Sequence, residues 1–160
     1  MIPKKILGID PGSENSAYML CLGNEPLSLE ITTNTELLKK LIHREQFFSD
    51  TEILLIEKVE GYGMPVGKTV FETVFWSGRF VQAWNGGFKQ IPRRDIKLHF
   101  CGSPRGKDSN IRQCLIDRFG VPGTKKNPNP ITYQIKKDLW QAFALIIFYL
   151  ETLKLEEIQC

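Results

Sequence analysis

The fold is decided by the stretch ILGIDPGS at residues 6–13. Its first four residues form an apolar run typical of a short β-strand, and the DPGS that follows is a strong turn signal. Two more strand-like runs come soon after, over residues 16–22 and 27–33. Strands so close in sequence are most simply an antiparallel meander. The chain is therefore expected to open with three strands, and Asp10 stands at the end of the first.

Helical and strand-like segments alternate after this meander. Asn34 or Thr35 can cap a helix that runs to about Phe47, and Ser109 can cap a later one. The apolar run ILLI at residues 53–56 is typical of a central strand buried on both sides. The other expected elements are helices near residues 69–84, 93–100, 109–119 and 134–155, a strand near 88–91, and loops at 61–67, 102–107 and 121–133. This order predicts one mixed α/β domain over residues 1–160.

The composition is that of an ordinary folded protein. Hydrophobic residues make up 42% of the 160 residues and charged residues 24%, which excludes a disordered chain. The longest apolar stretch, residues 142–150, is too short to span a bilayer. Residues 1–5 lack the apolar run and cleavage site of a signal peptide. We expect a cytoplasmic protein with no membrane partner.

The cysteine pattern argues against zinc and against a disulfide framework. Cys21, Cys101, Cys114 and Cys160 form no CxxC pair, and the two histidines lie far apart in sequence. We interpret the cysteines as reduced thiols in the core or on the surface.

Charge is distributed unevenly along the chain. The net charge is only +3, but residues 88–137 hold twelve Lys or Arg against three Asp or Glu. A basic block of this kind suggests an anionic partner, with nucleic acid as the first candidate, and a solvated basic face as the alternative. The candidate DNA-binding cations are Lys68, Arg93, Arg94, Lys97, Arg105, Lys107, Arg112, Lys125 and Lys126.

Three carboxylates stand at the ends of expected elements. Asp10 ends the first strand, Glu57 directly follows the buried run at 53–56, and Asp138 precedes the apolar part of the last helix. Buried carboxylates are costly unless they are paired or bound to metal, and a hard divalent cation would remove their mutual repulsion. Together they could hold Mg²⁺ ions that activate water against a phosphodiester. For each residue alone, a turn cap or a surface ion pair is the alternative.

The glycine-rich loop at residues 61–69, GYGMPVGKT, resembles a phosphate-binding loop without matching one. A Walker A motif needs four residues between its first glycine and its Gly-Lys-Thr, and Tyr62 occupies the position of that glycine. The glycines are better explained as shaping a loop near Glu57. Tyr62 and Met64 could then press on a base or a base step, or could simply pack under the loop.

The carboxylates and their surroundings resemble the RuvC family of Holliday junction resolvases. ILGIDPGS with Asp10, and the apolar strand that ends in Glu57, are similar to the family's first two acidic positions. The segments IPRRDIK at 91–97, GKDSNIRQ at 106–113 and KDLWQAFAL at 137–145 resemble, in order and spacing, the later parts of that family. The small, divergent chain is similar to phage-borne members, which places it in a bacterial or phage-infected cell.

The resemblance implies an RNase H-like fold with a five-stranded mixed sheet and helices on both faces. It implies a homodimeric, Mg²⁺- or Mn²⁺-dependent endonuclease that cuts four-way DNA junctions. Asp10, Glu57 and Asp138 match metal-ligand positions, and Lys107 matches a catalytic basic position near the scissile phosphate. The helix after Gly67, which carries Phe71, Val74, Phe75 and Phe80, lies where the family dimerises, although it could equally face the core.

One position departs from the family's pattern. The last helix of the family usually carries a second acidic ligand three residues after the first, and here Gln141 takes that place. The glutamine carbonyl can bind a metal ion but brings no charge, and Glu60 is a conceivable substitute. The departure motivates one alternative, a non-catalytic branched-DNA binder. Two others stay open on separate grounds. An RNase H-fold nuclease for other branched or flapped nucleic acids stays open because junction choice depends on dimer geometry. An ATP-binding fold of the sugar-kinase type also starts with a strand and Gly-x-Asp-x-Gly, although the chain is short for it.

Overall fold

The computed structural model describes residues 2–159, and within them the chain forms five strands and six helices. The strands are β1 (Lys5–Asp10), β2 (Asn15–Leu22), β3 (Glu25–Thr33), β4 (Ile53–Lys58) and β5 (Phe88–Pro92). The helices are α1 (Asn34–Ile42), α2 (Arg44–Phe47), α3 (Lys68–Trp84), α4 (Arg93–Cys101), α5 (Asp108–Phe119) and α6 (Leu139–Gln159).

The strands form one mixed sheet in the order β3-β2-β1-β4-β5. The first three pair antiparallel, as the meander predicted, whereas β1 with β4 and β4 with β5 pair parallel. Parallel neighbours end at the same edge of a sheet. The carboxyl ends of β1, β4 and β5 therefore bring residues 10, 57 and 93 to one side of the molecule.

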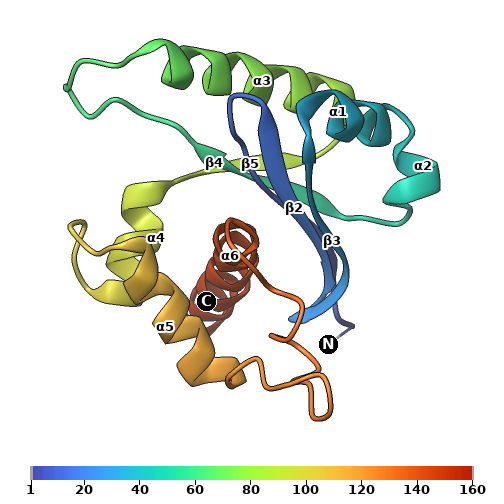
Figure 1. The fold of residues 1–160 in the computed structure, drawn as a ribbon, viewed down its shortest axis with the longest axis vertical. Coiled ribbons are helices and arrows are strands. Elements are labelled where there is room, and N and C mark those ends of the chain that lie inside the picture. Colours follow the sequence, from blue (N-terminus) through green and yellow to red (C-terminus); the bar gives the residue numbers. More distant parts are fainter. Residues whose placement is uncertain (1, 160) are drawn as a thin grey trace.

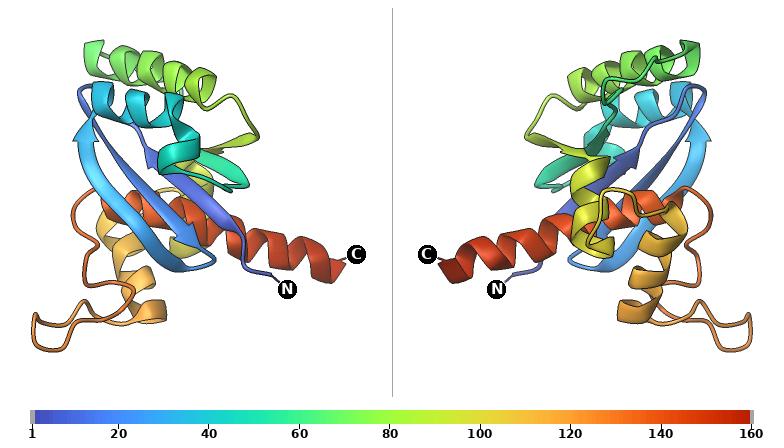
Figure 2. Two further views of the ribbon diagram at one scale, coloured as in Figure 1. Left: turned by 90° about the vertical axis from the view of Figure 1, so that its right-hand side faces the viewer. Right: turned by 90° about the vertical axis from the view of Figure 1, so that its left-hand side faces the viewer.

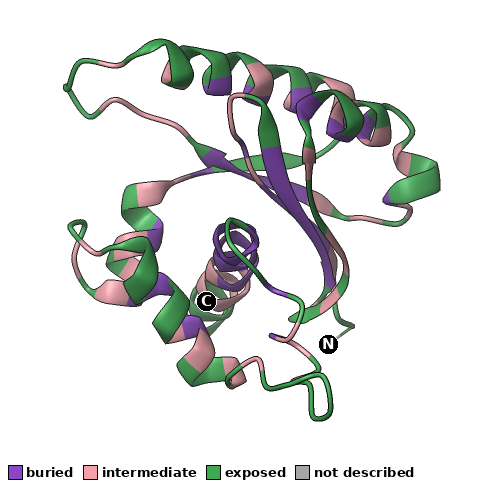
Figure 3. Cartoon of the chain, in the orientation of Figure 1, coloured by how far each residue is buried: buried purple, intermediate pink, exposed green. Residues whose placement is uncertain are grey.

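Helices cover both faces of this sheet (Figure 1). Alternate residues of β1 and β4, such as Leu7 and Ile56, pack against α1 and α3, while Ile6 and Leu55 pack in the core that contains α6. Figure 3 shows the buried residues concentrated in the central strands and in α6. The predicted architecture, a five-stranded mixed sheet with helices on both faces, is confirmed.

The close approach of α6 to β1 depends on Gly8. A Cβ atom at Gly8 would lie 2.7 Å from the carbonyl oxygen of Ala142 and 3.0 Å from Cγ1 of Ile146. Only a residue without a side chain lets the helix backbone lie so near the strand. This contact sets the first turn of α6 over the end of β1 that carries Asp10.

Two helix starts differ from the sequence prediction. Thr33, not Asn34 or Thr35, caps α1, because the Asn34 side chain is buried and bonded to Ser16 Oγ (2.6 Å) and to the Gly12 carbonyl (2.9 Å). The first residue flanking α5 is Lys107 rather than Ser109, and its N–H donates to Asn110 Oδ1 at 2.9 Å. Asn34 thus holds the turn after Asp10 in place.

Two expected helices are shorter than predicted. The helix at 34–47 is divided at His43, which leaves helical geometry (φ −97°, ψ 42°). The last helix begins at Leu139 instead of residue 134, since the chain before it forms turns and Lys137 adopts a left-handed conformation (φ 49°). Asp138 therefore precedes the helix, and its carbonyl accepts the N–H of Gln141 at 3.0 Å.

Two segments project from the body. Figure 2 shows the C-terminal part of α6 extending beyond the sheet on one side. On the other side, the loop at residues 121–133 projects as a narrow hairpin, closed by a bridge between Gly123 and Pro128. No helix within residues 2–159 combines the length and the apolar character needed to cross a membrane.

Candidate active site

Asp10 and Glu57 lie side by side at the carboxyl edge of the sheet. Ile9 is in register with Ile56 on the neighbouring parallel strand. Asp10 and Glu57, the next residue on each strand, therefore lie next to each other. Burial raises the pKa of Asp10 well above its ordinary value, and the nearby carboxylates of Glu57 and Asp138 raise it further. The three predicted acidic residues are thus close enough to repel one another.

The first turn of α6 brings the other two predicted ligands to this edge. Asp138 is exposed just before the helix, whereas Gln141 is 8% exposed and faces inward. The backbone N–H of Gln141 donates to the Asp138 carbonyl at 3.0 Å, so the two residues are joined where the helix begins.

Arg93 supplies a cation inside this acidic group. It starts α4 directly after β5, and its Nη1 donates to Glu57 at 3.2 Å (Oε1) and 3.3 Å (Oε2). Its Nη2 contacts the Asp108 carboxylate at the start of α5. The Glu57 and Asp108 carboxylates hold the pKa of Arg93 above its ordinary value although burial acts to lower it. Arg93 was predicted as a DNA contact, and its interactions here are with two carboxylates.

The donor set fits a hard divalent cation. Asp10, Glu57, Asp138 and the amide oxygen of Gln141 offer oxygen ligands, the kind that Mg²⁺ and Mn²⁺ prefer. The mutual repulsion at Asp10 is the electrostatic condition that a cation relieves. Within residues 2–159 no three Asp, Glu, His or Cys side chains stand in ready-made metal-binding geometry. The side chains therefore offer the oxygen donors that a divalent cation needs, and the positive charge of Arg93 already offsets part of their negative charge.

A basic pocket adjoins the acidic residues. It has a volume of about 330 Å³ and is lined by Tyr62, Arg93, Arg94, Lys97 and Pro104. The Tyr62 hydroxyl accepts the N–H of Arg94 at 3.4 Å, and Tyr62 itself holds a left-handed backbone (φ 50°). Four residues predicted separately from the sequence are therefore gathered at one pocket, and its lining contains no acidic side chain.

The remaining predicted DNA contacts are spread over a wider area. Met64 is 72% exposed on the loop before α3. Arg112 lies over the Trp140 ring at 5.5 Å, beside the first turn of α6. The others, all of them exposed, are Lys68, Arg105, Lys107, Lys125 and Lys126. Lys107 directly precedes Asp108, which Arg93 contacts, so its backbone lies beside the site.

Asp108 is the residue that the sequence interpretation missed. Its signal was present, since an acidic residue in the first turn of a helix faces the positive end of the helix dipole. Its pairing with Arg93 depends on how α4 packs against α5, and this packing cannot be predicted from a local sequence pattern. Glu60, the conceivable substitute ligand, instead pairs with Lys58 at 2.8 Å.

The exposed face of α3 is apolar. Phe71, Val74 and Phe75 are 64%, 47% and 62% exposed, whereas Phe80 is fully buried against the sheet. The expected contact with the core is confirmed on one side of the helix, and the expected dimer contact stays a prediction for the exposed side.

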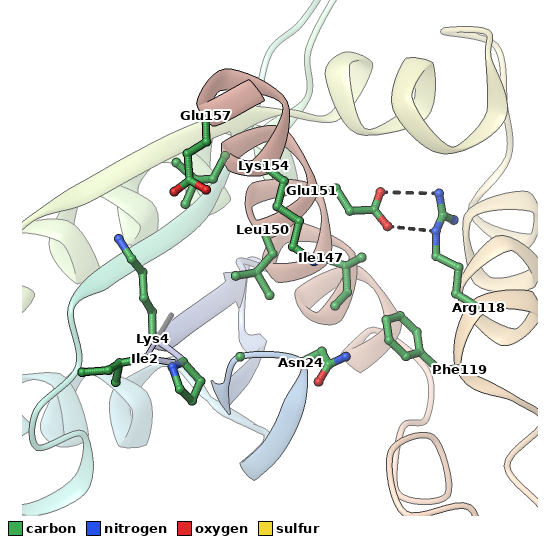
Figure 4. A pocket seen from close by; sticks show the side chains of 13 residues that line it. Ile2, Lys4, Asn24, Arg118, Phe119, Ile147, Leu150, Glu151, Lys154 and Glu157 are labelled. Atoms are coloured by element: carbon green, nitrogen blue, oxygen red, sulfur yellow. Dashed lines mark hydrogen bonds and ion pairs between the residues drawn. The ribbon is translucent and has the colours of Figure 1, made fainter. Parts of the chain in front are cut away.

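A cavity far from the carboxylates is lined by both ends of the chain. It has a volume of about 560 Å³ between the N-terminal strand and the later part of α6 (Figure 4). There Glu151 accepts from Arg118 Nε at 2.9 Å and contacts His99. None of the predicted site residues lines this cavity.

Among the described cysteines, Cys21, Cys101 and Cys114 are free thiols, as expected, and Cys160 lies outside the described residues. Burial raises the pKa of the Cys21 thiol to about 12.

The comparison with solved structures defines the fold class more narrowly. No protein-family model and no curated protein sequence matches the chain. A structure of Thermus thermophilus RuvC matches with a TM-score of 0.66 and 13% identity, over 92% of this chain and 96% of that one. The chain therefore has the RNase H-like fold in its RuvC-like form.

Two further solved structures have the same fold. T. thermophilus RuvC in complex with a Holliday junction substrate matches with a TM-score of 0.71 and 11% identity, over 96% of both chains. The fowlpox virus Holliday junction resolvase matches with a TM-score of 0.51 and 20% identity, over 92% of this chain and 99% of that one. These neighbours share nearly the full length of the chain.

Proposed function

We propose that this protein is a metal-dependent endonuclease that resolves four-way DNA junctions. The observation that carries the proposal is the meeting of Asp10, Glu57 and Asp138 at one edge of a RuvC-like sheet, beside a pocket lined by cations. The structural neighbours are Holliday junction resolvases, and one of them was solved with its junction substrate.

Asp10, Glu57 and Asp138, with Gln141, would hold Mg²⁺ or Mn²⁺. When bound, such ions supply an activated water and stabilise the leaving oxygen of a phosphodiester. Asp10 is the central ligand, because the carboxylates of Glu57 and Asp138 both act on its ionisation. Lys107 would stabilise negative charge that develops on the scissile phosphate.

The basic side chains would hold the DNA backbone on either side of the cut. Arg94 and Lys97 line the pocket next to the carboxylates, and Tyr62 offers an aromatic face to a base. The exposed hairpin with Lys125 and Lys126 projects on the side of the molecule that carries the first turn of α6 (Figure 2). It would contact DNA farther from the cut.

A homodimer would place two such sites on one junction. The stripe of Phe71, Val74 and Phe75 on α3 is a large apolar surface, and exposed patches of this kind mark protein interfaces. A symmetric dimer would offer one active site to each of two strands of a four-way junction.

The test uses end-labelled four-way junction, fork, linear duplex and single strand of matched sequence. Wild type and Asp10→Asn are incubated with each substrate in Mg²⁺, in Mn²⁺ and in EDTA. We expect paired cuts near the branch point that require the metal ion and are lost in Asp10→Asn. Equal cutting of forks or single strands would assign the site to a broader nuclease.

A second function is favoured by the neutral side chain of Gln141 and the presence of Arg93 among the ligands. A branched-DNA binder without catalysis would bind the junction tightly in EDTA and cut nothing in Mg²⁺ or Mn²⁺. The same experiment separates the two functions.

A further inference from the structure

Arg93 belongs to two adjoining sites at once. Its guanidinium contacts Glu57 on one side and Asp108 on the other, and the same side chain lines the basic pocket with Arg94 and Lys97. No other residue of the pocket lining contacts the acidic group in the part of the chain that the structure describes.

The contacts of Arg93 bear directly on the binding of a cation. Both Glu57 oxygens accept from the same Nη1, so the carboxylate offers its lone pairs to the guanidinium. Gln141 brings no charge where a second carboxylate on α6 would add one. The acidic group therefore has one negative charge fewer than an all-carboxylate set, and one of its carboxylates is already paired.

The Arg93 side chain has room to change partners. It is 29% exposed, and the Asp108 side chain is 53% exposed, whereas Glu57 is only 10% exposed. A guanidinium binds phosphate oxygens as readily as carboxylate oxygens, through paired hydrogen bonds. A phosphate in the basic pocket would thus be a competing partner for Arg93 on its open side.

We propose that Arg93 couples DNA binding to divalent-cation binding: it pairs with Glu57 when the pocket is empty, and a DNA phosphate in the pocket draws it away and frees that carboxylate. This inference rests on the proposed function, which supplies both the cation site and DNA as the source of the phosphate. Arg93 is a positioning residue, and the cation is held by Asp10, Glu57 and Asp138. The consequence is that the cation binds weakly until substrate is present.

The first test contains no DNA. Mn²⁺ affinity is measured at pH 8 and low salt from the electron paramagnetic resonance signal of free Mn²⁺. We expect Arg93→Gln to bind Mn²⁺ about tenfold more tightly than wild type, because the competing charge is gone. Arg94→Gln is the matched control: it removes a neighbouring charge of the same pocket that does not contact Glu57, and its affinity is expected to stay within about twofold of wild type.

Additional variants locate the effect and guard against misfolding. In the double variant Asp10→Asn with Arg93→Gln, the gain in Mn²⁺ affinity is expected to disappear, which places it at the carboxylates. If circular dichroism shows that Arg93→Gln does not fold, Arg93→Lys replaces it. Lysine keeps the charge but lacks the planar guanidinium fork that reaches Glu57 and Asp108 from two different nitrogens, so a smaller gain of about threefold is expected. An affinity equal to or weaker than that of wild type, in whichever variant folds, overturns the proposal.

The second test measures the coupling itself. Junction affinity is read by fluorescence anisotropy on ice, in EDTA and in Ca²⁺, with cutting checked in the same samples. By linkage, a cation whose binding is favoured by DNA must favour DNA binding by the same factor. We expect Ca²⁺ to tighten junction binding by wild type several-fold more than by Arg93→Gln. Equal factors would overturn the coupling, and the Mn²⁺ titrations keep their meaning whether or not the chain cuts junctions.

Discussion

At the scale of single residues, the site is a balance of charges within a few side chains. Asp10 is crowded by Glu57 and Asp138, and the guanidinium of Arg93 eases its ionisation. This balance has a cost in stability, since the folded protein holds a carboxylate that water would solvate better. Gln141 reduces that cost, because it adds no further charge.

The first prediction concerns stability, and the variant is Asp10→Asn measured in EDTA. The folded pKa of Asp10 lies above the ordinary value of 3.8. The ionised carboxyl therefore destabilises the folded state, and wild-type stability falls as the pH rises from about 3.8 through the raised pKa. For a chain of this size, each kcal/mol of stability changes the melting temperature by about 2–4 °C, so we expect Asp10→Asn to melt several degrees higher than wild type at pH 8.

The same thermal unfolding experiments, repeated at lower pH and with Mn²⁺, provide the control. The difference between variant and wild type should shrink as the pH is lowered toward 4, and Mn²⁺ should raise the melting temperature of wild type alone. A variant that melts lower than wild type at every pH would mean that Asp10 stabilises the turn at residues 10–13 instead.

The second prediction tests the neutral ligand position. Gln141→Asp adds a negative charge at a buried position three residues after Asp138, so the Mg²⁺ concentration for half-maximal junction cutting should fall about tenfold. Gln113→Asp adds the same charge at an exposed position on α5 and should leave that concentration unchanged. If the two variants behave alike, the side chain of residue 141 lies outside the metal site.

At the scale of elements, the site is formed where three strands end and one helix begins. Strands β1, β4 and β5 end at one edge, and α6 starts over that edge because Gly8 lets it approach. Each element is stabilised by its own apolar contacts, and the charged residues follow at its last or first position. The geometry of the site thus depends on packing between elements more than on the loops.

The third prediction is that Gly8→Ala disturbs the site without touching a ligand. The new methyl group would meet the Ala142 carbonyl at 2.7 Å, and the helix would have to shift. We expect a loss of about 1–3 kcal/mol in the free energy of unfolding, measured by urea denaturation, and weaker Mn²⁺ binding. Gly87→Ala meets only the Glu52 carbonyl oxygen, at an ordinary contact distance of 3.8 Å, and should change stability by less than about 0.5 kcal/mol. Unchanged stability in Gly8→Ala would show that α6 has freedom to move.

Much of this arrangement could be predicted from the sequence. Periodic apolar runs identified all five strands, and an acidic residue directly after a buried strand located Asp10 and Glu57 at one edge. The helix break at His43 and the start of α6 at Leu139 could not be predicted, because they depend on tertiary contacts and on the left-handed turn at Lys137. The role of Arg93 was missed for a similar reason: its partners lie on β4 and α5, far away in sequence.

At the scale of the whole molecule, the charged features and the apolar stripe of α3 belong to different elements. The acidic site, the basic pocket and the 121–133 hairpin are the charged features, whereas α3 presents Phe71, Val74 and Phe75. The α3 stripe lies on the face of its helix opposite to the sheet, so a partner could cover it without disturbing the core.

The fourth prediction is that the α3 stripe holds two copies together. Phe75→Asp should convert a dimer into a monomer, as measured by light scattering after size exclusion, because a charge would be buried at the centre of the stripe. Val121→Asp, at a side chain that is 68% exposed on the hairpin, should leave the dimer intact. A wild-type protein that is already monomeric at micromolar concentration would contradict the prediction.

The parallel register of β1, β4 and β5 has a consequence for how such a chain can diverge. Each charged group is placed by counting residues from the end of a strand, so its position survives almost any exchange of apolar residues that keeps strand length. Inserting or deleting one residue inside β4 would shift the register of the following residues against β1 by one, turn Glu57 to the opposite face of the sheet and carry it away from Asp10. Spacing is therefore under tighter physical constraint than composition, which explains how a TM-score of 0.71 coexists with 11% identity.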